Sequence, residues 1–196
     1  MAAPLWAGKP PAPPADPADF TPLDGLGLRF ENGSWFGEGL GWAMWIKPVT
    51  PEERLNFIER TTGFAIDPYA ARAGQHPLFV TFLLVIENRG NTTLDFSPQS
   101  AWLRTNRKQV LLPQGLAELS FNYRSIGREL PVAYERMGKA LYESAVSIPP
   151  GQQSAGLLVY ESLHSKTKAW DISLRLTLPD GERVALQAPY RRTKKK

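Results

Sequence analysis

Few residues of this chain are of the types that carry out nucleophilic, acid–base or metal chemistry. The sequence holds two histidines, His76 and His164, and no cysteine. A serine nucleophile needs a histidine base beside it, yet both histidines stand in polar segments and no serine occupies a Gly-x-Ser-x-Gly elbow. Two isolated histidines without cysteine do not make a typical zinc site. We therefore expect a protein that is not an enzyme, with no catalytic residue, no metal site and no cofactor.

The run Gly-Glu-Gly-Leu-Gly from Gly37 to Gly41 is the one glycine-rich stretch with the look of a ligand loop. A phosphate-binding loop would also need a Lys followed by Ser or Thr and a helix directly after it, and this run has neither. Glycines between apolar, strand-like residues indicate instead a bulge or the close approach of another backbone.

The aromatic residues around these glycines have some capacity for binding. If residues 34–49 form one strand, Trp35 and Trp45 share a face, while Phe36 and Trp42 share the other. Exposed, the two indoles of Trp35 and Trp45 would form a platform for a sugar ring or a partner peptide. The alternative, which we prefer, is that the strand is packed on both faces beneath the helix that follows.

The net charge is concentrated at the C-terminus. The formal charge is +4, but five of the last six residues are basic, and the rest of the chain has 18 basic against 19 acidic residues. A nearly neutral body gives no support to a nucleic-acid partner. We expect residues 191–196 to be a solvated tail, with contact to phosphate or anionic lipid as the alternative.

The first 22 residues are rich in proline and alanine, and seven of them are proline. Such a segment should be extended and polyproline-like rather than helical or hydrogen-bonded in a sheet. It lacks the continuous apolar stretch of a signal peptide. Because tethers of this kind are common in exported bacterial proteins, we expect an extracytoplasmic location, in the periplasm or at the cell surface, with the cytoplasm as the alternative. No apolar run approaches the ~20 residues of a membrane-spanning helix.

From residue 23 onward the pattern is that of short strands separated by turns. Asn32-Gly33 between extended runs predicts a β-hairpin, residues 78–88 predict a strand buried on both faces, and apolar residues alternate with polar ones from Trp170 to Leu178. Glycine and proline together make 34 of the 196 residues, which suits many turns.

Helices are expected at two places. Thr50 followed by Pro51 and Glu53 has the pattern of a capping box, with Gly63 as the C-terminal stop. Residues 115–142 carry weaker helical spacing and are expected to be a helical insertion.

These patterns predict a mainly β protein with an antiparallel β-sandwich, an N-terminal β-hairpin and one or two short helices. We expect one domain over residues 23–190, with an N-terminal elaboration at 23–76. The Pro-rich segment 1–22 precedes this domain and the basic tail 191–196 follows it.

Residues 79–109 and 147–161 carry a resemblance to a known family. Their order of strand, Asn-containing turn, strand, Pro-Gly turn and a strand ending in Tyr-Glu resembles the immunoglobulin-like domains of bacterial secreted proteins and lipoproteins, including the telokin-like group. The match covers residues 77–178, and the insertion at 115–142 departs from it. The resemblance implies an immunoglobulin-like sandwich and an extracytoplasmic interaction domain.

We therefore expect a domain that binds a protein partner or associates with itself at the cell surface, with peripheral attachment to a membrane as a further option. A free sheet edge could pair with a strand of the partner. The alternative is a carbohydrate-binding module that uses Trp35 and Trp45.

Overall fold

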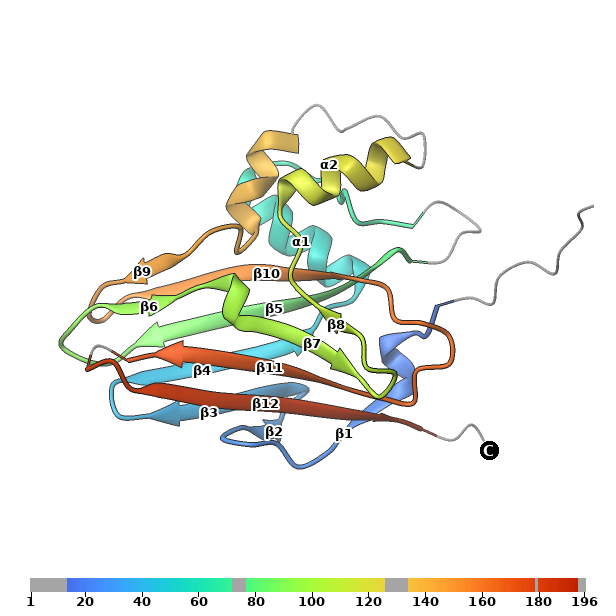
Figure 1. Cartoon of the computed structure of the whole chain (residues 1–196). Helices are drawn as coiled ribbons and strands as arrows, with labels where there is room; N and C mark the ends of the chain where they lie inside the picture. The colour runs from blue at the N-terminus through green and yellow to red at the C-terminus, as the bar shows by residue number, and fades with distance from the viewer. Residues whose placement is uncertain (1–13, 72–76, 126–133, 179, 194–196) are drawn as a thin grey trace, which may run out of the picture.

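Two antiparallel sheets lie face to face, and a small group of helices lies against one of them (Figure 1). The computed structural model describes residues 14–71, 77–125, 134–178 and 180–193. The mainly β sandwich predicted from the sequence is confirmed.

Each sheet has its own set of strands. The front sheet comprises β1 (Phe20–Pro22), β12 (Arg183–Arg192), β11 (Ala169–Thr177), β6 (Leu94–Phe96), β9 (Val146–Ile148), β7 (Ala101–Thr105) and β8 (Val110–Leu111). The back sheet comprises, in spatial order, β10 (Gln153–Glu161), β5 (Phe79–Asn88), β4 (Trp42–Pro48), β3 (Ser34–Gly39) and β2 (Arg29–Glu31). The helical elements are η1 (Pro17–Asp19), α1 (Pro51–Thr62), η2 (Pro98–Ser100), α2 (Leu116–Ser125) and η3 (Tyr134–Ala140).

The predicted buried strand is β5, which pairs with β10 on one side and with β4 on the other. Alternate side chains of β5, including Phe82, Leu84 and Ile86, are fully buried between the sheets. Burial of each such side chain contributes about 1.5–3 kcal/mol. Because β5 is covered on both sides and both faces, its sequence is almost continuously apolar.

The front sheet faces the core through the alternating residues of β11 and β12. Trp170 and Ile172 point inward with Leu174 and Leu176, and all four are buried. The ring of Trp170 stacks on that of Tyr190 at 3.9 Å between centroids. The period-two prediction for this segment is confirmed.

Helix α1 begins and ends where the sequence predicts. The Thr50 side chain accepts a hydrogen bond from the backbone N–H of Glu53, the Glu53 carboxylate accepts one from the N–H of Thr50, and Gly63 closes the helix at φ 80°. The insertion at 115–142 is helical over α2 and η3, and residues 126–133 lie outside the described part. These helices form a second, smaller core on the outer face of β5 and β10 around Ile58 and Leu119.

Residues 34–49 do not form one strand as the sequence suggested. Leu40 and Gly41, the latter at φ 81°, make a two-residue turn between β3 and β4, so that Gly39 pairs with Trp42. The tip of this hairpin is solvent-exposed. Within the hairpin Phe36 lies opposite Trp45, and the order of inward and outward residues is reversed after the turn.

The close approach predicted at the glycine-rich run is found at Gly37. A Cβ atom at this position would lie 2.6 Å from the Leu28 side chain and 2.8 Å from the Gly27 carbonyl oxygen. The segment before β2 therefore packs directly on the backbone of β3.

Both ends of the predicted domain need correction. Residues 17–22 are not a free polyproline segment: they form η1 and β1, which pairs with β12 as far as Arg192. Proline is tolerated here because Pro17 opens a short helix and Pro22 stands on an edge strand, positions that need no interior N–H donor. Arg191 and Arg192 consequently belong to β12 rather than to a tail.

Candidate functional site

Trp35 and Trp45 lie on opposite faces of the back sheet and do not form a platform. Trp35 is 1% exposed, and its ring lies edge-on to Phe30 at 5.4 Å and to Tyr190 at 6.0 Å. Trp45 is on the outer face, partly exposed, with the Phe36 ring 5.0 Å away. The platform on which the sugar-binding hypothesis depended is not formed, because the turn at residues 40–41 places the two indoles on opposite faces.

The outer face around Trp45 is covered by the protein's own charged side chains. The guanidinium of Arg89 lies 5.8 Å from the Trp45 ring, and that of Arg29 lies 4.2 Å from the Phe36 ring. Glu38 accepts hydrogen bonds from both arginines. Together these contacts leave Trp45 as part of a packed surface rather than an open binding face.

The long strands at the sheet edges are partly covered. Along β10, Val159 accepts a hydrogen bond from the backbone of Gln114, and Leu157 accepts one from Tyr142. Along β12, residues 23–26 form backbone hydrogen bonds with residues 187–189. Addition of a partner strand at these edges is therefore less favoured than the sequence suggested.

A groove of about 450 Å³ opens beside the N-terminal strand, and we call it the aromatic groove. It lies where three parts of the chain meet: η1 with β1, the junction between β4 and α1, and the start of β5. Its aromatic lining residues are Phe20, Phe30, Tyr69, Phe79 and Tyr190. Its proline lining residues are Pro17, Pro22, Pro48, Pro51 and Pro77.

Arg54 supplies a cation to the lining of the aromatic groove, and its guanidinium is hydrogen-bonded within the protein. Its Nε donates to both carboxylate oxygens of Asp67 at 3.0 Å, and its Nη2 donates to Oδ2 at 2.6 Å. Its Nη1 donates to the hydroxyl of Thr81 at 3.4 Å. The Thr81 hydroxyl still carries a proton of its own to donate. Because Asp67 neutralises the guanidinium, the groove favours a neutral, apolar ligand over an anion.

Burial affects the phenol that closes the groove next to the core. Tyr190 is 4% exposed, and loss of contact with water raises its pKa above the ordinary value of a tyrosine. Its hydroxyl therefore stays protonated at physiological pH. The groove thus presents apolar rings with a few fixed polar groups, which is the usual composition of a ligand-binding site.

Among the described residues, the side chains capable of acid–base or metal chemistry are not gathered into a site. His164 is exposed in the turn between β10 and β11, where its Nδ1 accepts the backbone N–H of Lys166 at 3.0 Å. His76 lies outside the described residues. Within the described ranges, no three His, Asp or Glu side chains come together as a metal site would require. The described helices also include none with the length and apolarity needed to cross a bilayer.

Sequence reasoning missed the aromatic groove because its lining comes from segments far apart in the chain. Phe20 and Tyr190 are separated by almost the whole sequence, and they meet only because β1 pairs with β12. The one local signal was the cluster of prolines at residues 48 and 51, which fixes the bend between β4 and α1.

The comparisons with known proteins give no family. No family model and no curated protein matches the chain. Among solved structures, the yjhA protein from Bacillus subtilis is similar over 81% of this chain and 93% of its own, with 10% identity and a TM-score of 0.36. A functionally unknown protein from Listeria monocytogenes EGD-e is similar over 89% of both chains, with 9% identity and a TM-score of 0.38. Likenesses this weak carry no argument about function.

Proposed function

We propose that the protein is a non-enzymatic, extracytoplasmic interaction domain that binds an extended apolar segment of a partner protein in the aromatic groove. The observation that carries this proposal is the groove itself, in which aromatic and proline rings surround a neutralised Arg54–Asp67 pair. Rigid rings of this kind contribute contact area with little loss of conformational entropy on binding.

The rim of the groove favours a peptide over a small enclosed ligand. Phe30 lines the groove and is 42% exposed. Leu23 and Leu26 are also exposed in the segment that runs from β1 toward β2. Apolar side chains that continue beyond a pocket extend the surface available to an extended chain. The Thr81 hydroxyl, which has a proton to donate, would then face a backbone carbonyl of the bound segment.

The location outside the cytoplasm rests on the sequence. The support is the resemblance to exported immunoglobulin-like domains and the Pro/Ala-rich segment at residues 1–22. Fractionation of the source bacterium followed by immunodetection tests it: protein in the periplasmic or surface fraction supports the proposal, and protein confined to the cytosol contradicts it.

Peptide selection against the full chain tests the groove. Displayed random peptides are selected for binding, and the binders are measured by calorimetry against the wild type and two variants. Phe30→Ser removes an exposed ring of the groove, and Phe121→Ser removes an exposed ring of α2 as the matched control. We expect apolar peptides whose affinity falls at least about tenfold with Phe30→Ser and is unchanged with Phe121→Ser.

Two results would overturn the proposal. One is a set of peptides that bind Phe30→Ser as tightly as the wild type, which would place the contact elsewhere. The other is amide chemical-shift changes on peptide addition that leave Phe20, Phe79 and Tyr190 unaffected. Thermal unfolding of both variants shows whether each is folded.

A further inference from the structure

Two turns and the end of β12 are held side by side by hydrogen bonds at one end of the sandwich. The backbone N–H of Asn106, in the turn after β7, donates to the Ala169 carbonyl at 2.9 Å. The Asn106 side chain accepts the N–H of Lys168 at 2.9 Å, and the N–H of Arg192 donates to the Lys168 carbonyl at 2.8 Å. Figure 1 shows this end, where the tip of β7 and the end of β12 lie near the C-terminus. These three segments therefore form one fixed surface.

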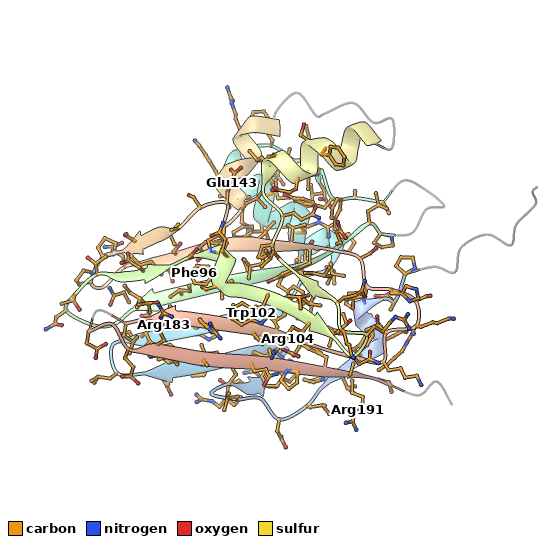
Figure 2. The ribbon with its side chains drawn as sticks, in the orientation of Figure 1. Phe96, Trp102, Arg104, Glu143, Arg183 and Arg191 are labelled. Atoms are coloured by element: carbon orange, nitrogen blue, oxygen red, sulfur yellow. The ribbon has the colours of Figure 1, made fainter. Side chains whose placement is uncertain are left out.

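Cationic side chains project from both turns and from the end of β12, and we call this surface the basic end. Its members are Arg107, Lys108, Lys166, Lys168, Arg191 and Arg192. All of them except Arg191 line one shallow hollow together with Asn106. Figure 2 shows Arg191 near the C-terminal end of β12, pointing away from the sheet.

Most of these cations form no ion pair with a described residue. Within the described part of the chain, Arg192 is the one member that forms an ion pair, to Asp19 at 2.9 Å. Arg104, on β7, is not part of the group because it lies 3.3 Å from Asp171. Cations left without acidic neighbours make a local positive potential although the body of the protein is nearly neutral.

Lys108 occupies a backbone conformation that lysine rarely adopts. Its φ is 62°, and its N–H donates to the Thr105 carbonyl at 3.0 Å to close the turn. Glycine or asparagine takes this left-handed conformation more easily. A cation at a position that favours glycine is consistent with a role for the charge.

Exposed apolar side chains adjoin the cations. Leu78 is 40% exposed and lines a second shallow hollow together with Arg107 and Lys166. Val110 and Leu112, which follow the basic turn, are 61% and 55% exposed. Cations beside exposed aliphatic side chains match the interface of a membrane, where headgroup phosphates lie above the acyl chains.

We propose that the basic end is a docking surface for an anionic phospholipid membrane, with the cations on the lipid phosphates and Leu78, Val110 and Leu112 at the acyl boundary. Nucleic acid is the less fitting polyanion, because the described residues that line the two hollows include no Phe, Tyr or Trp to stack on a base. The proposal goes beyond the aromatic groove and does not depend on what that groove binds.

Vesicle co-sedimentation of the full chain tests the proposal. Vesicles of phosphatidylcholine alone are compared with vesicles that also contain phosphatidylglycerol. We expect binding only to the anionic vesicles and weaker binding at high salt. Each removed cation should reduce the partition coefficient about fivefold, so Lys166→Ala with Lys168→Ala should reduce it about 25-fold. The matched control is Arg60→Ala with Arg183→Ala, which removes two exposed cations elsewhere on the molecule; Figure 2 shows Arg183 at the opposite end of β12.

A variant at Lys108 separates binding from folding. Lys108→Gly relieves the left-handed strain, so the protein should unfold at the wild-type temperature or above it while its binding to anionic vesicles falls about fivefold. A variant that binds vesicles as the wild type does would contradict a role for this charge.

Two further measurements distinguish a membrane from other phosphate-containing ligands. Val110→Ser should weaken vesicle binding and leave the weak binding of inorganic phosphate unchanged, because only a membrane uses the apolar side chain. Equal binding to neutral and anionic vesicles would overturn the proposal. So would tighter binding to a single-stranded oligonucleotide than to anionic vesicles, which would make the basic end a nucleic-acid surface.

Discussion

The guanidinium of Arg54 lies 2.6 Å from the carboxylate of Asp67, and the two side chains are only 7% and 8% exposed. This ion pair fastens α1 to the segment that follows it, and the bond from Arg54 to Thr81 extends the connection to β5. The three elements that it joins border the aromatic groove. The pair therefore holds the groove in shape, and Asp67 neutralises the guanidinium of Arg54 that lines it.

Removing only one member of the Arg54–Asp67 pair should lower the stability of the protein far more than removing both. Arg54→Met leaves the Asp67 carboxylate buried without a counter-charge, and we expect the free energy of unfolding to fall by about 3–5 kcal/mol. Arg54→Met with Asp67→Leu removes both charges and should recover most of that loss. Urea unfolding measures both changes. Arg60→Met, at an exposed position of the same helix, is the control and should change stability by less than about 0.5 kcal/mol. Equal losses in the single and double variants would contradict this account.

Trp35 and Trp45 should differ in how much they contribute to stability. Trp35→Ala removes a fully buried ring and should lower the free energy of unfolding by about 3–5 kcal/mol. Trp45→Ala removes a partly exposed ring and should cost at most about 2 kcal/mol. Denaturant unfolding followed by circular dichroism measures both. A larger loss for Trp45 than for Trp35 would be inconsistent with their placement on opposite faces.

Local sequence signals predicted the elements well because their causes are local. The capping box of Thr50 and Glu53 and the stop at Gly63 involve neighbours in sequence, and the helix has those limits. The alternation from Trp170 onward reflects one face in the core and one outside, and β11 follows it.

The prediction about Trp35 and Trp45 failed because one turn was not recognised. Leu40-Gly41 lacks the Asn-Gly or Asp-Gly pattern that most strongly marks a hairpin, and the apolar run seemed continuous across it. A turn of two residues reverses the direction of the chain and resets which residues share a face.

The aromatic groove and the basic end could not be predicted for a different reason. Phe20 meets Tyr190, and Lys108 meets Lys168, through the pairing of distant strands. Neither cluster leaves a pattern within a short window of the sequence. The basic residues Arg107 and Lys108 stand in one turn and Lys166 and Lys168 in another, and neither pair is unusual by itself.

The capping carboxylate of Glu53 should make part of the stability depend on pH. The hydrogen bond from Lys47, at 2.7 Å, and the one from the Thr50 backbone hold the pKa of Glu53 below its usual value. A carboxyl group whose pKa is lower in the folded state stabilises the fold above the unfolded value of about 4.3. Its contribution is lost as the pH falls through the folded-state pKa.

Comparison with Glu53→Gln measures this contribution. The variant should be less stable than the wild type at about pH 7, and the difference should shrink as the pH falls toward about 3. Lys47→Met removes the hydrogen bond that does most to lower the pKa of Glu53. In that background the difference in stability at neutral pH between the protein with Glu53 and its Glu53→Gln variant should be smaller. A difference that stays constant over this range would show that ionisation of Glu53 does not contribute.

The buried tyrosines should stay un-ionised at alkaline pH as long as the protein is folded. Removal from water raises the pKa of Tyr142 to about 12 and raises those of Tyr160 and Tyr190 as well. The unfolded chain ionises its tyrosines near pH 10, so the stability that these groups provide is present below about pH 10 and declines as the pH rises further.

Ultraviolet titration of the folded protein at about pH 11 should leave these three of the six tyrosines un-ionised, while in urea all should ionise together. Tyr142→Phe, which loses the 3.1 Å hydrogen bond to Ser154, should reduce the number of protected tyrosines by one. Ionisation of all six near pH 10 with the circular dichroism spectrum unchanged would contradict the burial of these phenols in the core.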